Sequence, residues 1–330
     1  TVRLSMTLIL PNALHTWATR ALTLAGARAI DAEQIARYLV DVDIRGIVTH
    51  GSRQIPRYVG EFVNGQINPE PTQKILQETD NSVRVHGDGG AGYLTATVAA
   101  DLACEKALAT GLALATTCHH GHVGSAGIYA RRALTHGLIS WGMAGGAAWR
   151  KPTSPDATVW DAMAAPPMCF GVPSDAGGPP LVLDMNANQF KRSDGAEAAL
   201  AAGFHRSVFG SLGMRFVSTL LAGSLAGTSA EGTSSWERAT RGFFFVVIDP
   251  ALVGDADAFR TSVRDVIDQS LSLKPMAGLA EAALPGTKEW RREQERPTTG
   301  VPIPDEHRQQ LEEVATSLKM DSPEWLKDQA

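Results

Sequence analysis

The chain has 330 residues, of which 44% are hydrophobic and 20% are charged, and its formal net charge at pH 7 is −5. This composition is that of a globular protein with one or two sizeable cores, and the lack of a basic run in the sequence argues against nucleic acid as a partner. Three scattered cysteines exclude a disulfide framework and predict a cytoplasmic location, and the apolar opening of the sequence is too short for a membrane span.

Helical periodicity dominates the beginning of the chain. Apolar residues recur at helical spacing over residues 11–29, where Gly26 is a stop signal. Asp31 and Gln34 form a capping-box pattern at the start of a second helix, which ends at Gly46. Residues 57–65 predict a third, shorter helix. The side chains expected to face inward are Leu14, Trp17, Ala18, Ala21 and Leu22 in the first helix and Ile35, Leu39 and Val42 in the second.

Strand and helix patterns alternate through the rest of the chain, which predicts an α/β fold. The expected strands are residues 75–86, 112–117, 138–144, 168–172, 181–185 and the continuously apolar 242–248. The expected helices are residues 95–110, 125–136, 209–226, 257–271 and 305–318. The side chains expected to face inward in the last three are Leu212, Phe216, Leu220 and Leu221, then Phe259, Val263, Val266 and Ile267, and finally Leu311, Val314 and Leu318. We expect the last helix to pack on the first helices. This predicts a helical domain of residues 1–75 with 290–330 and an α/β domain of residues 76–289.

A glycine-rich run at residues 87–92 fits the dinucleotide fingerprint G-x-G-x-x-G between a strand and a helix. That fingerprint requires an acidic residue at the end of the next strand. The next strand ends instead in Cys118, His119 and His120. We therefore interpret residues 87–92 as a structural turn.

The polar loop after Gly46 carries Thr49, His50, Arg53 and Arg57. The pKa of an unperturbed imidazole lies near neutrality, so His50 suits proton transfer. An arginine nearby offers two parallel donors to a carboxylate. A solvated surface histidine is the alternative interpretation, because a single histidine in a loop is often no more than that.

Histidines also cluster at 119, 120 and 122, where an apolar strand opens into a glycine-rich turn before a helix that is expected to begin at Ser125. Free backbone N–H groups at such a turn favour a flat ligand with an anionic or carbonyl group. A zinc site is the alternative. Alternation along an extended chain points His119 away from His120, and the nearby sequence offers no carboxylate, so no metal is expected.

These motifs resemble those of the type 2 malate/L-lactate dehydrogenase-like family of NAD(P)-dependent oxidoreductases. Residues 43–51 resemble its D-x-R-G-x-x-S-H-G, and R-x-P-R-Y and N-G-x-I-x-P patterns follow. The second motif resembles H-F-G-x-A-G-x-Y, matched by His119, Gly121, Gly127 and Tyr129, with His120 in place of the usual aromatic residue. The resemblance implies an α/β malate/L-lactate dehydrogenase-like, non-Rossmann fold with a mixed-sheet cofactor domain and a helical domain, in a homodimer.

The resemblance also implies roles for individual residues. His50 would donate or accept the proton with help from Thr49, Asp184 would hydrogen-bond His50, and His119 would line the nicotinamide and substrate pocket. The implied substrate-binding residues are Arg53, Gln54 and Arg57, and the implied cofactor-binding residues are His120, Gly121, Ser125, Phe209, Gly210 and Gly286. The cofactor would be NAD or NADP, and the substrate a small 2-oxo acid, 2-hydroxy acid or cyclic imino acid.

Four departures from the family pattern keep other functions open. Gln54 stands where the family has an arginine, residues 164–167 replace G-T-N-P, Phe209 replaces a lysine, and the region after Asp184 is short. One alternative is a non-redox acid–base enzyme that performs an elimination, isomerisation or condensation on the same fold. The other is a catalytically silent binding subunit.

Overall fold

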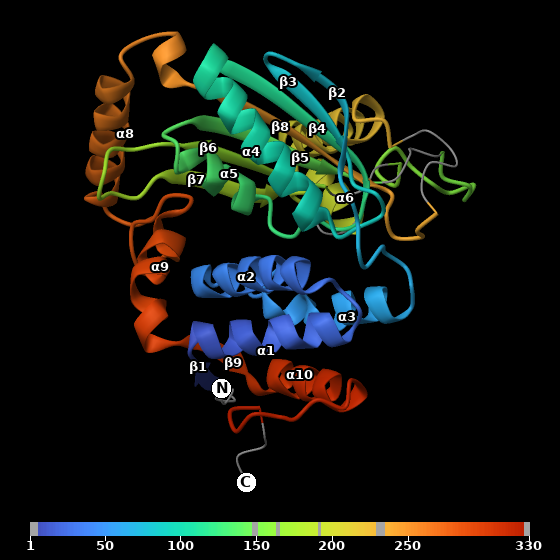
Figure 1. Cartoon of the computed structure of the whole chain (residues 1–330). Coiled ribbons are helices and arrows are strands. Elements are labelled where there is room, and N and C mark those ends of the chain that lie inside the picture. The colour runs from blue at the N-terminus through green and yellow to red at the C-terminus, as the bar shows by residue number, and fades with distance from the viewer. Residues whose placement is uncertain (1–5, 147–150, 163–165, 191–192, 229–234, 327–330) are drawn as a thin grey trace. The chain divides into compact units, whose positions relative to one another are not determined.

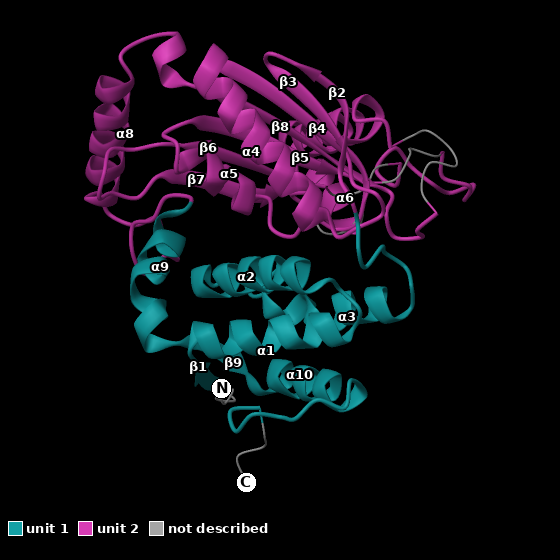
Figure 2. Ribbon diagram, viewed as in Figure 1, with its two compact units in different colours: residues 1–71, 286–330 teal, residues 72–285 magenta. Residues whose placement is uncertain are grey.

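The computed structural model describes residues 6–146, 151–162, 166–190, 193–228 and 235–326 (Figure 1). The chain divides into two compact units, residues 1–71 with 286–330 and residues 72–285 (Figure 2). The boundaries expected from the sequence are 75/76 and 289/290. Ala164 and Ala165, at one of the departures from the family pattern, lie outside the described residues.

The first unit is mostly helical. Its helices are α1 (Pro11–Leu24), α2 (Ala29–Arg45), α3 (Ile55–Val63), α9 (Thr287–Thr299) and α10 (Asp305–Ser317), with the short 3-10 helix η1 (Ser52–Gln54). β1 (Met6–Ile9) and β9 (Val301–Pro304) form an antiparallel pair. All inward side chains expected for α1 and α2 are buried, as are Leu311 and Val314 of α10. Helical periodicity therefore predicted these faces correctly.

The second unit is built on a mixed sheet. Its strands are β2 (Lys74–Thr79), β3 (Ser82–His86), β4 (Leu112–His120), β5 (Ile139–Gly145), β6 (Pro167–Val172), β7 (Leu181–Asn186) and β8 (Arg241–Ile248). They lie in the order β2-β3-β4-β8-β5-β6-β7, and β3 and β4 run parallel while the other pairs are antiparallel. β8 lies between β4 and β5 with Phe243, Phe245 and Val247 fully buried. The prediction of a buried strand at residues 242–248 is confirmed.

Helices cover both faces of this sheet, as consecutive residues of β6 show. Cys169 packs with Ala126 and Ala130 at the start of α5 (Gly127–Leu134), whereas Met168 packs with Ala222 of the π-helix η2 (Leu220–Leu225). Neighbouring residues of a strand point to opposite faces. α5 and η2 therefore lie on opposite faces, and α4 (Gly92–Thr110) joins α5 on its side (Figure 1).

Several element boundaries differ from those expected. Residues 75–86 form two antiparallel strands rather than one, because Asp80 and Asn81 make a turn between β2 and β3. β4 continues to His120, and α5 begins at Gly127 rather than at Ser125. The helices α6 (Ser193–Ala201) and α9 were not predicted, and α8 (Ala256–Leu271) leaves Val266, predicted inward, 60% exposed.

The helix α7 (His205–Thr219) buries a polar face, contrary to the prediction. Ser211 is buried and its hydroxyl donates to the carbonyl oxygen of Ala187 at 3.0 Å, while a guanidinium nitrogen of buried Arg215 donates to the carbonyl oxygen of Trp160 at 2.8 Å. Leu220, predicted inward, is 49% exposed. Residues 205–225 are long and apolar enough to cross a membrane by composition alone, but η2 packs against the sheet as a core helix does.

Candidate active site

The loop that carries His50 begins where α2 ends. Gly46 adopts the left-handed conformation (φ 83°) that closes α2, and the backbone N–H of His50 donates to the carbonyl oxygen of Ile47 at 3.1 Å. The amide of Gln54 donates to the carbonyl oxygen of Thr49 at 2.7 Å, and the Thr49 hydroxyl lies 2.9 Å from His50 Nδ1. The structure thus brings Thr49 and His50 together as a hydrogen-bonded pair on a loop that turns back on itself.

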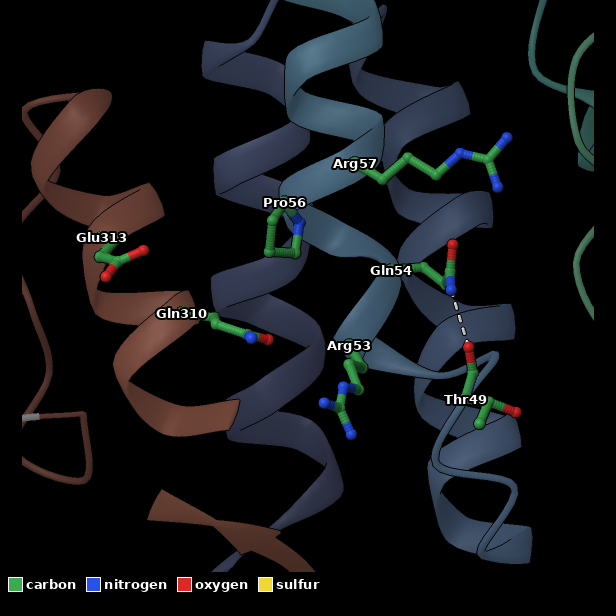
Figure 3. A pocket seen from close by; sticks show the side chains of 7 residues that line it. All are labelled: Thr49, Arg53, Gln54, Pro56, Arg57, Gln310 and Glu313. Carbon is green, nitrogen blue, oxygen red and sulfur yellow. Dashed lines mark hydrogen bonds between the residues drawn. The ribbon is translucent and has the colours of Figure 1, made fainter. Parts of the chain in front are cut away.

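A cavity of about 540 Å³ opens at this loop, and Thr49 is one of its lining residues whereas His50 is not. It is lined by Thr49, Arg53, Gln54, Pro56, Arg57, Gln310 and Glu313 (Figure 3). Arg53 and Gln310 point into the space between α10 and the loop, whereas Arg57 points away from α10 (Figure 3). The cavity therefore contains all three residues that the sequence predicts to bind substrate, and Gln310 and Glu313 join them from a helix that the motifs do not reach.

The two arginines are held differently. Arg53 lies 3.3 Å from Glu306, whose side chain is 72% exposed, and Arg57 lies 2.8 Å from Glu61, whose side chain is 6% exposed. An exposed ion pair contributes little free energy, whereas breaking a pair with a buried partner leaves an uncompensated charge. Arg53 is therefore the arginine that can turn to a substrate carboxylate at low cost.

A buried polar cluster supports the loop from below, and sequence reasoning missed it. Asp43, in the last turn of α2, accepts a hydrogen bond from the backbone N–H of Ser52 at 2.8 Å. The Ser52 hydroxyl lies 3.4 Å from Nε2 of His307, a buried residue of α10. Burial raises the pKa of the Asp43 carboxyl to about 7 and lowers the pKa of His307 to about 4. Asp43 belongs to the D-x-R-G motif, but nothing in the local sequence points to His307.

In the second unit, the histidines at the end of β4 are buried. His119 is 5% exposed and has a positive φ of 55°, which is uncommon for a residue with a side chain. Its ring lies 5.0 Å from that of His86, and burial is the main cause of its lowered pKa. A hydrogen bond with the backbone of Gly227 raises this pKa against the effect of burial, so the ring is already engaged within the protein.

His120 is fully buried, with both ring nitrogens engaged within the protein. Nδ1 lies 2.8 Å from the carbonyl oxygen of Gly121, and Nε2 lies 2.6 Å from the hydroxyl of Thr117. Burial lowers its pKa to about 4, so the ring is neutral at pH 7, with Nδ1 donating to Gly121 and Nε2 accepting from Thr117. These bonds give His120 a structural role. Its contact with a cofactor stays a prediction.

The glycine-rich run at residues 87–92 is joined to the same strand end. The backbone N–H of Gly87 donates to Cys118 at 2.8 Å, that of Gly89 donates to His119 at 3.0 Å, and Gly90 accepts from Gly121 at 2.8 Å. A Cβ on Gly89 would lie 2.1 Å from the ring of Trp236. Protein groups take the backbone positions that a phosphate would need, so the structural turn is confirmed.

Asp184, at the end of β7, binds the turn before α5. Its Oδ2 accepts hydrogen bonds from the Ser125 hydroxyl and, at 2.8 Å, from the backbone N–H of Gly127. Gly127 is packed tightly here, because a Cβ on it would lie 2.8 Å from the same oxygen. His50 belongs to the other unit, and its pairing with Asp184 stays a prediction.

The remaining predicted cofactor residues differ in how open they are. Phe209 is 65% exposed on α7, and a Cβ on Gly210 would meet nothing within 4 Å, so a flat ring has room on this turn. Gly286 takes a φ of 89° at the start of α9, in the first unit. Ser125 is 4% exposed and occupied by Asp184. The contact of these residues with a cofactor stays a prediction.

Comparison with known proteins agrees with the motifs. The sequence profile of the malate/L-lactate dehydrogenase family matches residues 9–201 and 187–312. L-sulfolactate dehydrogenase of Methanocaldococcus jannaschii is 25% identical over 338 residues, which cover 90% of this chain and 93% of that protein. A malate dehydrogenase of Pyrococcus abyssi is 33% identical over 172 residues, which cover 52% of this chain and 46% of that protein.

The fold has a close counterpart among solved structures. Malate dehydrogenase from Pyrococcus horikoshii OT3 aligns with a TM-score of 0.79 at 22% identity, over 96% of this chain and 97% of that one. The predicted α/β fold with a mixed sheet and a helical part is confirmed. Since the family profile covers most of its length, the chain belongs to the malate/L-lactate dehydrogenase family of oxidoreductases.

Proposed function

We propose that the protein is an NAD(P)-dependent oxidoreductase that interconverts a small 2-hydroxy acid and the corresponding 2-oxo acid. The observation that carries this proposal is that Thr49, whose hydroxyl lies 2.9 Å from His50 Nδ1, lines a cavity of about 540 Å³ together with Arg53. A proton carrier and a carboxylate anchor are the two groups that a 2-hydroxy acid requires from the protein. Dehydrogenase relatives support the nicotinamide cofactor.

In the proposed reaction His50 accepts the proton of the substrate hydroxyl, and in the reverse direction it returns that proton to the 2-oxo oxygen. The Thr49 hydroxyl, 2.9 Å from Nδ1, helps to fix the orientation of the ring. Asp184 would stabilise the protonated imidazole. A bound nicotinamide supplies the acceptor for the hydride that leaves C2 of the hydroxy acid.

Substrate binding in this proposal rests on the cavity. Arg53 exchanges its exposed partner Glu306 for the substrate carboxylate, and Gln54, which stands where relatives have an arginine, holds the loop through Thr49. His119 would line the nicotinamide and substrate pocket, as its place in the family motif implies. The flat parts of the cofactor would lie along Phe209–Gly210, with Gly121, Ser125, His120 and Gly286 as the other predicted contacts.

The test is a spectrophotometric assay at 340 nm with NAD or NADP and a panel of malate, lactate and sulfolactate, run in both directions. We expect turnover of at least one acid with one cofactor, and the preferred cofactor decides between NAD and NADP. Failure of the folded protein to bind either reduced cofactor at millimolar concentration, measured by fluorescence, would overturn the proposal.

A second candidate function is supported by the engaged groups in the second unit. His120 and Ser125 are both hydrogen-bonded internally, and Phe209 offers no charge to a phosphate. A non-redox acid–base reaction by His50 would need none of these residues. Substrate turnover without any added nicotinamide would establish it, and strict dependence on the cofactor would exclude it.

We also propose a cytoplasmic homodimer. The three cysteines of the chain are free and buried, which suits a reducing compartment. Leu220, at the start of η2, is 49% exposed, and such an apolar side chain suits contact with a second copy. Light scattering coupled to size exclusion would measure the mass, and a monomer at micromolar concentration would contradict this assembly.

A further inference from the structure

The carboxyl group of Asp43 lies directly beneath the loop that carries His50. Asp43 is 3% exposed, and its Oδ2 accepts the backbone N–H of Ser52 at 2.8 Å. A Cβ on Gly51 would lie 1.8 Å from Oδ1, so the carboxyl packs against the bare backbone of Gly51. Gly51 and Ser52 follow His50 immediately in the chain. The carboxyl thus holds the two residues that fix where the His50 backbone points.

The cluster is closed on its other sides by two helices of the same unit. From α10, His307 meets the Ser52 hydroxyl with Nε2 at 3.4 Å, and its Nδ1 has no hydrogen-bond partner among the described residues. From α9, the guanidinium of Arg296 donates to the backbone oxygen of Asp43 at 2.8 Å. Ser52 is therefore held between a carboxyl on α2 and an imidazole on α10.

Stability alone does not call for a carboxyl at this position. Burying an ionisable group costs free energy, and a negative charge in the last turn of a helix opposes the helix dipole. An apolar side chain on α2 would avoid both costs. The hydrogen bond from the Ser52 N–H to its carboxyl comes from the loop, so what the carboxyl adds is a fixed loop rather than a stronger helix.

We propose that Asp43 is a positioning residue, which clamps Gly51 and Ser52 and thereby sets the Thr49–His50 pair at the edge of the cavity. This inference rests on the proposed role of His50. Displacing a catalytic group by about 1 Å can lower the rate about a hundredfold, so loss of the clamp has a catalytic effect although Asp43 touches no substrate.

The protonation state of the clamp follows from its surroundings. Burial raises the pKa of the Asp43 carboxyl to about 7, against the hydrogen bonds of Ser52 and the charge of Arg296, which lower it. The other titratable group that faces the cluster is His307, whose lowered pKa of about 4 keeps it neutral. Near pH 7 the clamp therefore changes between a neutral and a charged carboxyl, and both forms keep an oxygen that can accept the Ser52 N–H.

The experiment compares Asp43→Ala with Asp43→Asn in the full-length protein. Alanine removes the acceptor, and we expect kcat to fall ten- to a hundredfold with KM changed less than threefold. Asparagine keeps an acceptor for the Ser52 N–H, and we expect it to restore most of kcat at pH 7. Wild-type kcat in Asp43→Ala, or a fall that asparagine does not restore, would overturn the proposal.

A matched control separates positioning from stability. Asp31 is also a buried carboxylate on α2, 7% exposed, but it pairs with Arg28 at 2.8 Å at the beginning of the helix. We expect Asp31→Ala to lower the melting temperature and leave kcat of the folded protein unchanged. Equal losses of kcat in Asp31→Ala and Asp43→Ala would mean that the effect is general destabilisation, which would overturn the proposal.

A second readout does not depend on any enzymatic activity. The imidazole signals of His50, assigned by their loss in His50→Gln, should be sharp in the wild type and broadened or doubled in Asp43→Ala. If no acid is turned over but these signals change, the proposed function fails and the clamp stands. If turnover is normal and the signals do not change in Asp43→Ala, the clamp fails and the proposed function stands.

Discussion

The loop at residues 49–54 and the turn at residues 119–127 both combine histidines with glycines, but they use these residues in opposite ways. In the loop, Thr49, Arg53 and Gln54 line a cavity, and the buried partners are Asp43 and His307 beneath it. In the turn, the polar groups of His120 and Ser125 are bonded to the protein itself. The loop directs side chains toward a cavity, whereas most of the polar groups named in the turn are hydrogen-bonded within the protein.

The glycines show the same contrast. Gly51 is required because a carboxyl lies against it, at a place where that contact orients a candidate catalytic residue. Gly124 has a positive φ of 73°, and a Cβ on it would lie 2.3 Å from the ring of Tyr93. A glycine-rich turn beside histidines therefore does not by itself indicate a ligand site, because close packing of protein on protein produces the same sequence.

The largest expected effect tests the loop. His50→Gln should lower kcat by about a hundredfold or more, because a general acid–base group typically contributes that much to the rate. Steady-state kinetics at saturating cofactor would measure it. His136→Gln is the control, since His136 is an exposed histidine whose removal should leave kcat unchanged. Full activity of His50→Gln would exclude His50 as the proton carrier, and the loop would then have no catalytic role that distinguishes it from the turn.

The next effect tests the turn. Gly124→Ala should destabilise the protein by about 3 kcal/mol, because the methyl group meets the Tyr93 ring and the backbone conformation is one that alanine rarely adopts. Chemical denaturation followed by circular dichroism would measure the loss. Gly213→Ala is the matched control, because a Cβ there meets nothing within 4 Å inside α7 and should stabilise the helix by about 1 kcal/mol.

Local pattern predicted the parts of the molecule in which local contacts decide the structure. The inward faces of α1 and α2 and the buried strand β8 were all predicted, because periodicity and apolar runs report burial directly. Thr49 and His50 are neighbours in the chain, so their pairing needed no long-range information. The cavity that Thr49 lines did need long-range information, because Gln310 and Glu313, which also line it, come from the other end of the sequence.

Long-range polar contacts account for what the sequence did not predict. The cluster of Asp43, Ser52 and His307 joins α2 to α10, and no periodicity reports such a contact. On α7, Ser211 and Arg215 are buried because they reach backbone oxygens of Ala187 and Trp160. A hydrophobicity pattern assigns such polar residues to solvent, so it missed these buried positions, although Leu221, which it predicted inward, does pack against the core.

Opposite pH dependences of Asp43 and His307 provide a finer test of the loop. The raised pKa of Asp43 makes the folded state retain a proton that the unfolded state loses, so this residue lowers stability as the pH rises from about 4 to about 7. The lowered pKa of His307 makes the unfolded state bind the extra proton, so this residue raises stability as the pH rises from about 4 to 6.5. In the wild type the two contributions nearly cancel.

Removing either group should reveal the other. Relative to wild type, Asp43→Asn should become more stable as the pH rises from 4 to 6.5, and His307→Gln should become less stable, each by up to about 1.4 kcal/mol per pH unit. Urea unfolding at several pH values would measure both differences. Parallel curves for both variants and the wild type would show that neither group titrates abnormally, and the clamp would then lack its expected protonation change.

The smallest expected effect separates the two arginines of the cavity. Arg53→Gln should raise KM for the acid about tenfold with kcat unchanged, because it removes an interaction made equally in the ground and transition states. Arg57→Gln should change KM little but lower stability, because it leaves the buried Glu61 without its ion pair. Glu306→Gln releases Arg53 from an exposed partner and should lower KM by about twofold. A large rise in KM in Arg57→Gln alone would make Arg57 rather than Arg53 the carboxylate anchor, on the side of the cavity that faces away from α10.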